Sequence, residues 1–368
     1  MPSAIVVGAG IFGASLARHL ARDGWRVSLV DKDRPGHERG ASGDASRLLR
    51  SAHGADHWYV RSARRARELW RQVEEESGTR LFEEVGVAWL ARSPDGWEAE
   101  SERTLRDEGI PVERVDPEAG RELFPSFDPD GLDFVLVEPE AGVLRARAAL
   151  LAVVDQAVES GAQLVLGEAR PAGDAVELDG ERRSADVVVW ACGAWLAGLF
   201  PGLVELRVTR QDLLYFEAPD EWRTPPVPAW VDYEAAFYGL GSLDSVGVKL
   251  VSDAIGPSFD PDLAAEVSPQ SEAATRAYAA TRFPSLAEAP LAHGRVCPYA
   301  LTVDTNFIVA PHGEHETVWI LGGGSGHGFK HGPALAEYVA GLFEEEEPDP
   351  RFALGRRGPG GGLRTASQ

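Results

Sequence analysis

Apolar and polar positions change their period several times along the chain, and each change marks a predicted element. Ala4–Val7 is a short, continuous apolar run, which is typical of a buried strand. Ile11–Arg22 repeats apolar residues at helical spacing, and Arg26–Val30 then alternates as a second strand does. The chain therefore begins with a strand, a turn, a helix and another strand.

The turn after the first strand is rich in glycine. Gly8, Gly10 and Gly13 form the pattern G-x-G-x-x-G, and Asp31 follows the second strand. Such glycines let the backbone approach a pyrophosphate at the positive N-terminus of the helix, and the acid can accept hydrogen bonds from a ribose. This segment predicts a dinucleotide-binding site without separating FAD from NAD.

The rest of the pattern predicts two domains, each assembled from separate parts of the chain. A helix over 59–76 is followed by short alternating segments over 79–137, which we interpret as an inserted domain. A helix-to-strand unit near 146–165 and a strand over 186–191 return to the first domain, and strand-like segments over 210–294 form a second pass through the inserted one. We predict an α/β fold in which a Rossmann-like domain carries a second, sheet-containing domain inserted in two passes. The predicted division is 1–78, 140–209 and 295–343 for the first domain, 79–139 and 210–294 for the second, and 344–368 for a flexible tail.

Composition and charge exclude several classes of function. The net charge of -22 repels nucleic acid phosphates and anionic membranes, so we expect neither as a partner. No apolar run approaches the roughly 20 residues that span a bilayer, and the N-terminus has no secretory signal pattern. We expect a cytoplasmic protein, with a monomer as the working assumption. Two cysteines are too few for a disulfide framework or a paired-cysteine zinc site, and we assign Cys192 to the core.

Lysine is nearly absent, since only Lys32, Lys249 and Lys330 occur among 36 basic residues. A lysine that persists in such a composition is a candidate for a site where a guanidinium cannot replace an ammonium. We interpret Lys32, in a polar stretch after a strand, as a surface residue.

A second glycine-rich loop, Leu321–Lys330, lies between a strand and a helix that are predicted within 318–343. Its backbone N–H groups can form another anion-binding concavity, and its glycines exceed what a tight turn requires. Lys330 lies at the mouth of this loop, where we expect it to bind a carboxylate. His327 and His331 are four residues apart, but glycines interrupt them and no third ligand is near in sequence, so we predict no metal site. Hydrolase and metalloprotease motifs are absent.

The chain contains seven segments that resemble the motifs of a known protein family and follow one another in the same order. They are Gly8–Gly13 with Asp31, Gly43–Arg50, Cys192–Trp195, Arg210–Gln211, Gly247–Leu250, Cys297–Asp304 and Ser325–Lys330. In these segments the chain resembles the FAD-dependent amine oxidases typified by monomeric sarcosine oxidase, within the D-amino acid oxidase superfamily. The resemblance covers most of the chain. It implies that the first domain binds FAD and that the second binds the substrate.

The resemblance also implies roles for individual side chains. The cysteine that matches Cys297 is joined to the flavin through sulfur, and the lysine that matches Lys249 promotes the reaction with oxygen. Arg50 and Lys330 match the pair that holds the substrate carboxylate. Further matches place Arg47 near the flavin, Tyr238 in the pocket wall, Gly326 and His327 beside the substrate, and Ser46, Gly324 and Gly328 beside the cofactor.

One position departs from the family, which has a histidine four residues after the lysine where this chain has Asp253. A carboxylate in that pocket favours a substrate with a cationic or N–H donor group. We therefore doubt that sarcosine is the substrate and expect a cyclic or further functionalised amino acid. Asp253 paired with a surface arginine, outside the pocket, remains the alternative.

The sequence thus predicts an FAD-dependent oxidase of a small secondary or cyclic amino acid. Hydride transfer to flavin N5 gives an imine, and oxygen then takes the electrons and forms hydrogen peroxide. The alternatives are a dehydrogenase of the same fold with another electron acceptor and a flavin-binding interaction protein without turnover.

Overall fold

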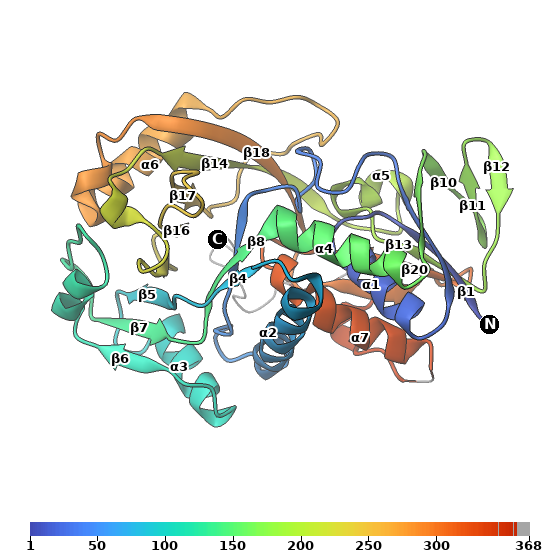
Figure 1. The fold of residues 1–368 in the computed structure, drawn as a ribbon, viewed down its shortest axis with the longest axis horizontal. Helices are drawn as coiled ribbons and strands as arrows, with labels where there is room; N and C mark the ends of the chain where they lie inside the picture. Colours follow the sequence, from blue (N-terminus) through green and yellow to red (C-terminus); the bar gives the residue numbers. More distant parts are fainter. Residues whose placement is uncertain (345, 356, 359–368) are drawn as a thin grey trace.

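The computed structural model describes residues 1–344, 346–355 and 357–358. Figure 1 shows helices α1, α4 and α7 gathered at one end of the molecule, and the long strands β14 and β18 reaching toward the other. Two large sheets organise these two ends.

The first sheet has six strands in the order β19-β20-β13-β1-β2-β9. Neighbours run parallel except β19 and β20, which are antiparallel. The predicted strand, helix, strand order at the N-terminus is confirmed. The bounds are β1 Ser3–Val7, α1 Ile11–Arg22, β2 Arg26–Asp31, β9 Gln163–Leu166, β13 Val187–Trp190, β19 Ile308–Pro311 and β20 Val318–Gly322.

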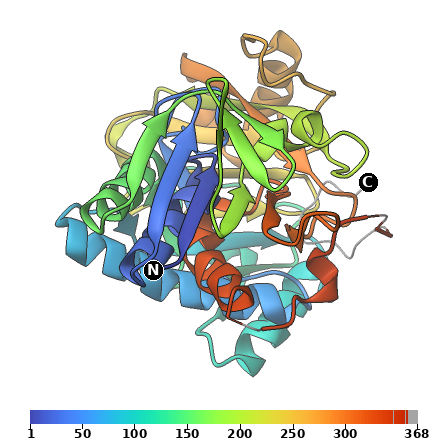
Figure 2. The same cartoon turned by 90° about the vertical axis from the view of Figure 1, so that its right-hand side faces the viewer.

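The two faces of this sheet bury alternate residues, as the period of a strand requires. Ala4 and Val6 pack with helices α1, α4 (Ala146–Glu159) and α7 (Gly332–Leu342). Ile5 and Val7 face the opposite way, onto a small sheet of β10 (Ala169–Ala172), β11 (Ala175–Leu178) and β12 (Glu181–Arg183). In Figure 2 the blue strands lie above helices coloured blue and red. The central sheet is thus covered on both faces.

The second large sheet has eight strands in the order β18-β14-β17-β16-β15-β5-β7-β6. Its parallel pair, β15 with β5, joins the two passes of the inserted domain, with Trp230 opposite Ala88. The predicted fold class is therefore confirmed. The bounds are β5 Val87–Ala91, β6 Glu113–Val115, β7 Phe134–Glu138, β14 Arg207–Phe216, β15 Ala229–Asp232, β16 Phe237–Leu240, β17 Val248–Ser252 and β18 Leu291–Leu301.

Helix α3, Trp97–Asp107, was missed in the first pass of the inserted domain, where we predicted only short alternating segments. Its buried face carries Glu98, Ser101 and Thr104 beside two apolar residues, so no apolar stripe reveals the helical period. The remaining elements include α2 His57–Ser77, α5 Leu196–Leu199, α6 Pro269–Arg282, and a small sheet of β3 Ser46–Leu49, β4 Phe82–Glu83 and β8 Gly142–Arg145.

Strands β14 and β18 pair antiparallel over their whole length and link the two ends of the molecule. The boundaries that we placed at 209/210 and 294/295 fall inside these strands. A boundary drawn from composition cannot detect a strand that continues from one domain into the next. The domain division itself stays a prediction.

The expectation of a flexible tail is wrong for part of it. Phe352 is fully buried and packs edge-on against Trp58, with ring centroids 4.7 Å apart. Arg351 pairs with Asp56 at 3.0 Å, and the more distal Arg357 pairs with Asp304 at 3.2 Å. Within the predicted tail, residues 345, 356 and 359–368 lie outside the described residues.

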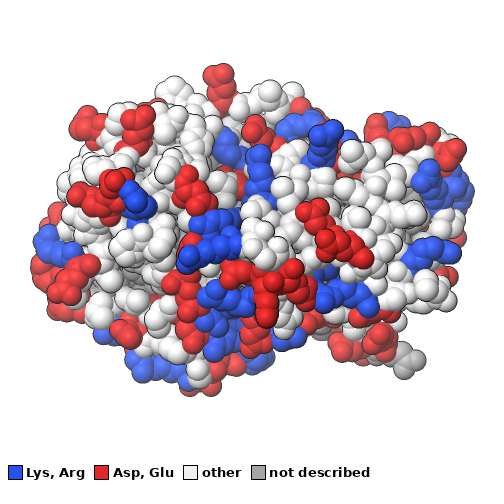
Figure 3. Space-filling view, in the orientation of Figure 1, with Lys and Arg blue, Asp and Glu red and all other residues white. Residues whose placement is uncertain are grey.

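The surface mixes both signs of charge despite the acidic excess. Figure 3 shows blue and red side chains interleaved on one face of the molecule. Arg65, for example, pairs with Glu68 and Glu337, each at 2.8 Å. Among the described residues, no helix is both long enough and apolar enough to cross a membrane.

Candidate functional site

A cavity of about 440 Å³ runs from the N-terminal glycine turn to the end of strand β18. Both glycine-rich loops contribute to its wall. Of the predicted site residues, those that line the cavity are Gly8, Gly10, Asp31, Arg47, Cys297, Gly324, Gly326 and Gly328. Gly13, Ser46, Arg50, Tyr238, Lys249, Asp253, His327 and Lys330 lie outside its wall.

The first glycine turn is fixed by close backbone contacts. Gly8 has φ +108°, and a Cβ there would lie 2.4 Å from the Ala191 carbonyl oxygen. A Cβ on Gly13 would lie 1.9 Å from the Gly8 carbonyl oxygen, so helix α1 can approach strand β1 only if this residue is glycine. The first turn of α1 carries no acidic side chain, and the positive end of the helix faces the cavity.

Asp31 lies in the cavity wall at the end of β2, as predicted. Its Oδ2 atom accepts a hydrogen bond from the Ala9 N–H at 2.6 Å, and Oδ1 accepts one from the Asp33 N–H at 2.9 Å. The carboxylate thus also holds the glycine turn in place.

The second glycine loop packs against α1. A Cβ on Gly328 would lie 2.7 Å from Cζ of Phe12, and Gly326 has φ +79°. His327 turns away from the cavity, and its Nε2 lies 2.9 Å from the Thr305 carbonyl oxygen. Gly324, Gly326 and Gly328 thus line the cavity, whereas the His327 side chain lies outside its wall.

A buried cluster of charges lies at the β18 end of the cavity, around a residue that the sequence did not single out. Asp44, only 2% exposed, accepts a hydrogen bond from Lys249 Nζ at 2.5 Å and another from the Tyr215 hydroxyl at 2.7 Å. Arg47 pairs with the same carboxylate, and Arg295 Nη1 lies 3.7 Å from its Oδ1. Burial alone would raise the pKa of Asp44, but the three cations hold that pKa far below its usual range.

Lys249 is completely buried at the centre of this cluster. Burial lowers its pKa to about 8, while the Asp44 carboxylate opposes that shift. Its ammonium also donates to the Ser46 carbonyl oxygen at 3.1 Å. Ser46 thus holds the lysine through its backbone, and its predicted contact with a cofactor stays a prediction.

The two cysteines both line the cavity, and Cys192 also packs against buried apolar side chains of the core. Cys192 is half-buried, and its thiol donates to the Val7 carbonyl oxygen at 3.4 Å. Burial raises the pKa of Cys192 well above its usual value, so this thiol keeps its proton. Cys297 is fully buried on β18, with Sγ 3.9 Å from Nη2 of Arg47.

A second group of charges includes Arg50, Lys330 and Glu138. Glu138 is 2% exposed and accepts hydrogen bonds from the Ser51 N–H at 2.8 Å and the Trp89 indole N–H at 2.7 Å. Burial lowers the pKa of Lys330 well below its usual value, and the Arg50 guanidinium lowers it further while Glu138 opposes both. Arg50 and Lys330, which were predicted to act together, thus lie close enough to repel each other.

Asp253 lies beside the same arginine. Burial lowers the pKa of Arg50, and the carboxylates of Glu138 and Asp253 oppose that shift. Asp253 is half-buried, and its negative charge also acts on Tyr238, whose hydroxyl lies 3.4 Å from that of Tyr299 in the cavity wall. The role of Asp253 in the pocket stays a prediction.

The sequence missed Asp44, Glu138 and His53, each a buried polar residue. Asp44 could have been found, because it is the acid within the segment Gly43–Arg50. Glu138 ends an apolar strand, and an acid at a strand end is also typical of the start of a surface turn. His53 has no pattern of its own and meets its partners only through the fold.

The fold and the cavity define a protein that binds a dinucleotide cofactor. The chain belongs to the FAD dependent oxidoreductase family, whose model matches residues 3–342. It is 29% identical over 357 residues to monomeric sarcosine oxidase of Bacillus sp. (strain B-0618), covering 92% of this chain and 91% of that protein. It is 28% identical over 370 residues to N-methyl-L-tryptophan oxidase of Yersinia pestis (strain Pestoides F), covering 96% and 98%.

Among solved structures, L-proline dehydrogenase from P. horikoshii superposes with a TM-score of 0.82 at 22% identity, covering 93% of each chain. The residues present fit FAD, because the cavity meets the N-terminus of α1 and its wall includes Gly8 and Gly328, where the packing excludes a Cβ atom. The predicted family, fold class and enzyme class are confirmed.

The glycine turn yields a direct prediction. Gly13→Ala should reduce the flavin that copurifies with the protein and destabilise the fold by about 1–3 kcal/mol, because the new methyl group overlaps the Gly8 carbonyl oxygen. Gly198→Ala is the matched control, since Gly198 also lines the cavity and has open space around it. The flavin-to-protein absorbance ratio and the thermal midpoint measure both effects. A Gly13→Ala protein with full flavin content and an unchanged midpoint would contradict the argument.

Proposed function

We propose that this protein is an oxidase of a small secondary or cyclic amine that carries a carboxylate, and that it forms an imine and hydrogen peroxide. FAD, when bound, supplies the redox chemistry by accepting a hydride and passing two electrons to oxygen. The observation that carries the proposal is the pair of cations, half-buried Arg50 and buried Lys330, close to the carboxylate of Glu138.

The positive groups of this cluster support a carboxylate-bearing substrate. The Arg50 guanidinium lowers the pKa of Lys330, and the Glu138 carboxylate opposes that effect. A substrate carboxylate beside the two cations would stabilise both charges, with a planar fork from Arg50 and a point charge from Lys330. Asp253, on the other side of Arg50, would bind the N–H or a second donor group of the same molecule.

Asp253 also bears on which amine is used. An ionised carboxylate beside the reacting nitrogen would favour the protonated amine, whereas oxidation requires the free amine. This conflict disappears when the acid binds a second donor group, or an N–H that does not react. We therefore expect cyclic or further functionalised amino acids to be better substrates than N-methylglycine.

Lys249 supports an oxidase rather than a dehydrogenase that uses another acceptor. A buried ammonium stabilises the negative charge that develops on oxygen during its reduction. The position of Lys249, fully buried between Asp44 and the Ser46 carbonyl, provides a fixed charge for that purpose. Arg47 supplies a second cation at the cavity wall.

We further propose that Cys297 carries the flavin through its sulfur. Cys297 is the fully buried cysteine of the cavity wall, and the Arg47 guanidinium lies close enough to stabilise negative charge on its sulfur. Cys192 is the weaker candidate, because burial raises the pKa of its thiol and the Val7 carbonyl binds the proton.

The covalent link can be tested by denaturation. Flavin fluorescence should stay with wild-type protein and with Cys192→Ser on a denaturing gel, and should be lost from Cys297→Ser. Both substitutions keep a small polar side chain, so they form a matched pair. Release of all flavin from the denatured wild type would show that no such link forms.

The substrate class can be tested with a panel of amines scored by peroxide release. The panel contains N-methylglycine, proline, pipecolate, cyclic imines and their decarboxylated counterparts. Arg50→Met should lower kcat/KM for the acids by about 2–5 kcal/mol, which is about thirtyfold to several thousandfold, because the remaining charges stay desolvated. Arg114→Met is the control, since Arg114 lies on β6 at the edge of the eight-stranded sheet and is partly exposed.

Three outcomes of this panel have distinct meanings. Efficient oxidation of decarboxylated amines by wild type would refute the carboxylate site. Flavin bleaching by an acid under nitrogen without peroxide formation in air would identify the dehydrogenase alternative. No bleaching by any amine would favour a flavin-binding protein without turnover.

A further inference from the structure

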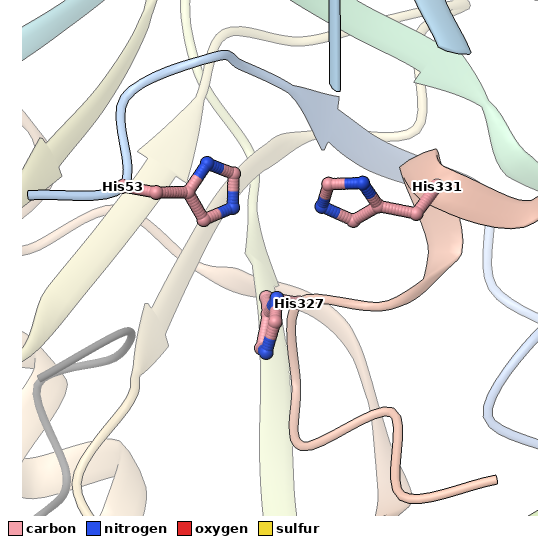
Figure 4. Close-up of side chains that lie close together, drawn as sticks. All are labelled: His53, His327 and His331. Atoms are coloured by element: carbon pink, nitrogen blue, oxygen red, sulfur yellow. The ribbon is translucent and has the colours of Figure 1, made fainter. Parts of the chain in front are cut away.

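Three buried histidines meet outside the cavity, from two segments that are far apart in the sequence. His53 follows strand β3, whereas His327 and His331 flank the turn that leads into α7. Their exposed fractions are 1%, 6% and 0%, and one ring nitrogen from each lies within 4.8 Å of the other two. Figure 4 shows the three rings arranged around a common space, with His53 opposite His331. The reason given above for excluding a metal, the lack of a third ligand, is therefore wrong.

Hydrogen bonds on the outer side of each ring determine which nitrogen faces this space. His53 Nδ1 lies 2.8 Å from the Ser51 carbonyl oxygen, and His327 Nε2 lies 2.9 Å from the Thr305 carbonyl oxygen. A carbonyl oxygen only accepts, so these two nitrogens carry the protons and the opposite nitrogens present lone pairs. His331 Nδ1 lies 2.9 Å from the Ser62 hydroxyl, which can accept in the same way.

The inward nitrogens include two that have no hydrogen-bond partner among the described residues. They are Nε2 of His53 and Nε2 of His331, and both atoms are buried. Converging lone pairs in a dry interior are costly unless a cation or a donor lies between them.

We propose that His53, His327 and His331 supply three ligands to one zinc-type transition-metal ion. Neutral imidazoles are ligands that Zn²⁺ prefers, and the absence of a carboxylate among the three ligands disfavours Mg²⁺ and Ca²⁺. Outer hydrogen bonds to carbonyl oxygens, like those to Ser51 and Thr305, are what metal-bound histidines usually make. Zn–N bonds of about 2.0–2.1 Å require the nitrogens to approach each other more closely, which small ring rotations provide.

Nearby charges act on this site in both directions. Lys330 and Arg50 disfavour a cation, because both lower the pKa of His53. Glu138 offsets part of that charge and connects to the site, since it binds the Ser51 N–H while the Ser51 carbonyl binds His53. The ion would tie the segment after β3 to the turn before α7, and these two segments carry Arg50 and Lys330.

The proposal is tested by metal content and stability, without reference to enzyme activity. Flavin-loaded protein, expressed with added Zn²⁺ and then dialysed, should retain about one zinc per chain. Added Zn²⁺ should raise the thermal midpoint of metal-depleted protein, and zinc-edge X-ray absorption should report nitrogen ligands. His53→Phe should lower the zinc content at least about tenfold while its ring keeps the place stacked on Tyr59.

His315→Ala is the control, because His312, Glu314 and His315 form the other grouping of potential ligands among the described residues. This variant should keep its zinc. Zinc that is lost from His315→Ala and kept by His53→Phe would overturn the proposal. Wild-type protein that holds no zinc after dialysis and shows no shift of its thermal midpoint with added Zn²⁺ would also overturn the proposal. This second test does not depend on whether His53→Phe folds.

Discussion

The carboxylate of Asp44 is the group on which the rest of the site depends. It is buried where the loop before β3 meets the sheet formed by β14, β17 and β18, and Lys249, Arg47 and Arg295 surround it. An ionised carboxylate in such a place is costly unless every lone pair is satisfied, and Tyr215 supplies the neutral donor. Removal of one buried partner typically costs about 3–5 kcal/mol, because the remaining charges stay desolvated.

This arrangement explains how two separate requirements meet at one place. The glycine turns need backbone contacts so close that no Cβ fits, which forms the cavity for the cofactor. The chemistry needs positive charge at the end of that cavity, and Asp44 allows three cations to lie there together. Lys249 stays charged near neutral pH only because the carboxylate opposes the effect of burial.

Sequence reasoning singles out a residue where a local rule connects its type and position to a predicted role. The turn at Gly8 with Asp31 obeys such a rule, and the scarcity of lysine makes Lys249 and Lys330 conspicuous. It fails where a polar residue is buried by distant partners, as Asp44, Glu138 and His53 are. The amphipathic period that reveals most helices is absent from α3, whose buried face is polar. The tail shows the same limit, because only the fold reveals that Phe352 packs against Trp58.

The most direct measurement is the pH dependence of the reaction of reduced enzyme with oxygen, in wild type and in Asp44→Asn. Lys249 is a cation below its pKa of about 8, so the wild-type rate should fall as pH rises through about 8. Without the Asp44 carboxylate, burial and the nearby arginines lower the pKa of Lys249 further. The account predicts that the midpoint of this fall shifts to lower pH by at least about one unit in Asp44→Asn. An unchanged midpoint, or a rate that does not vary with pH in wild type, would contradict it.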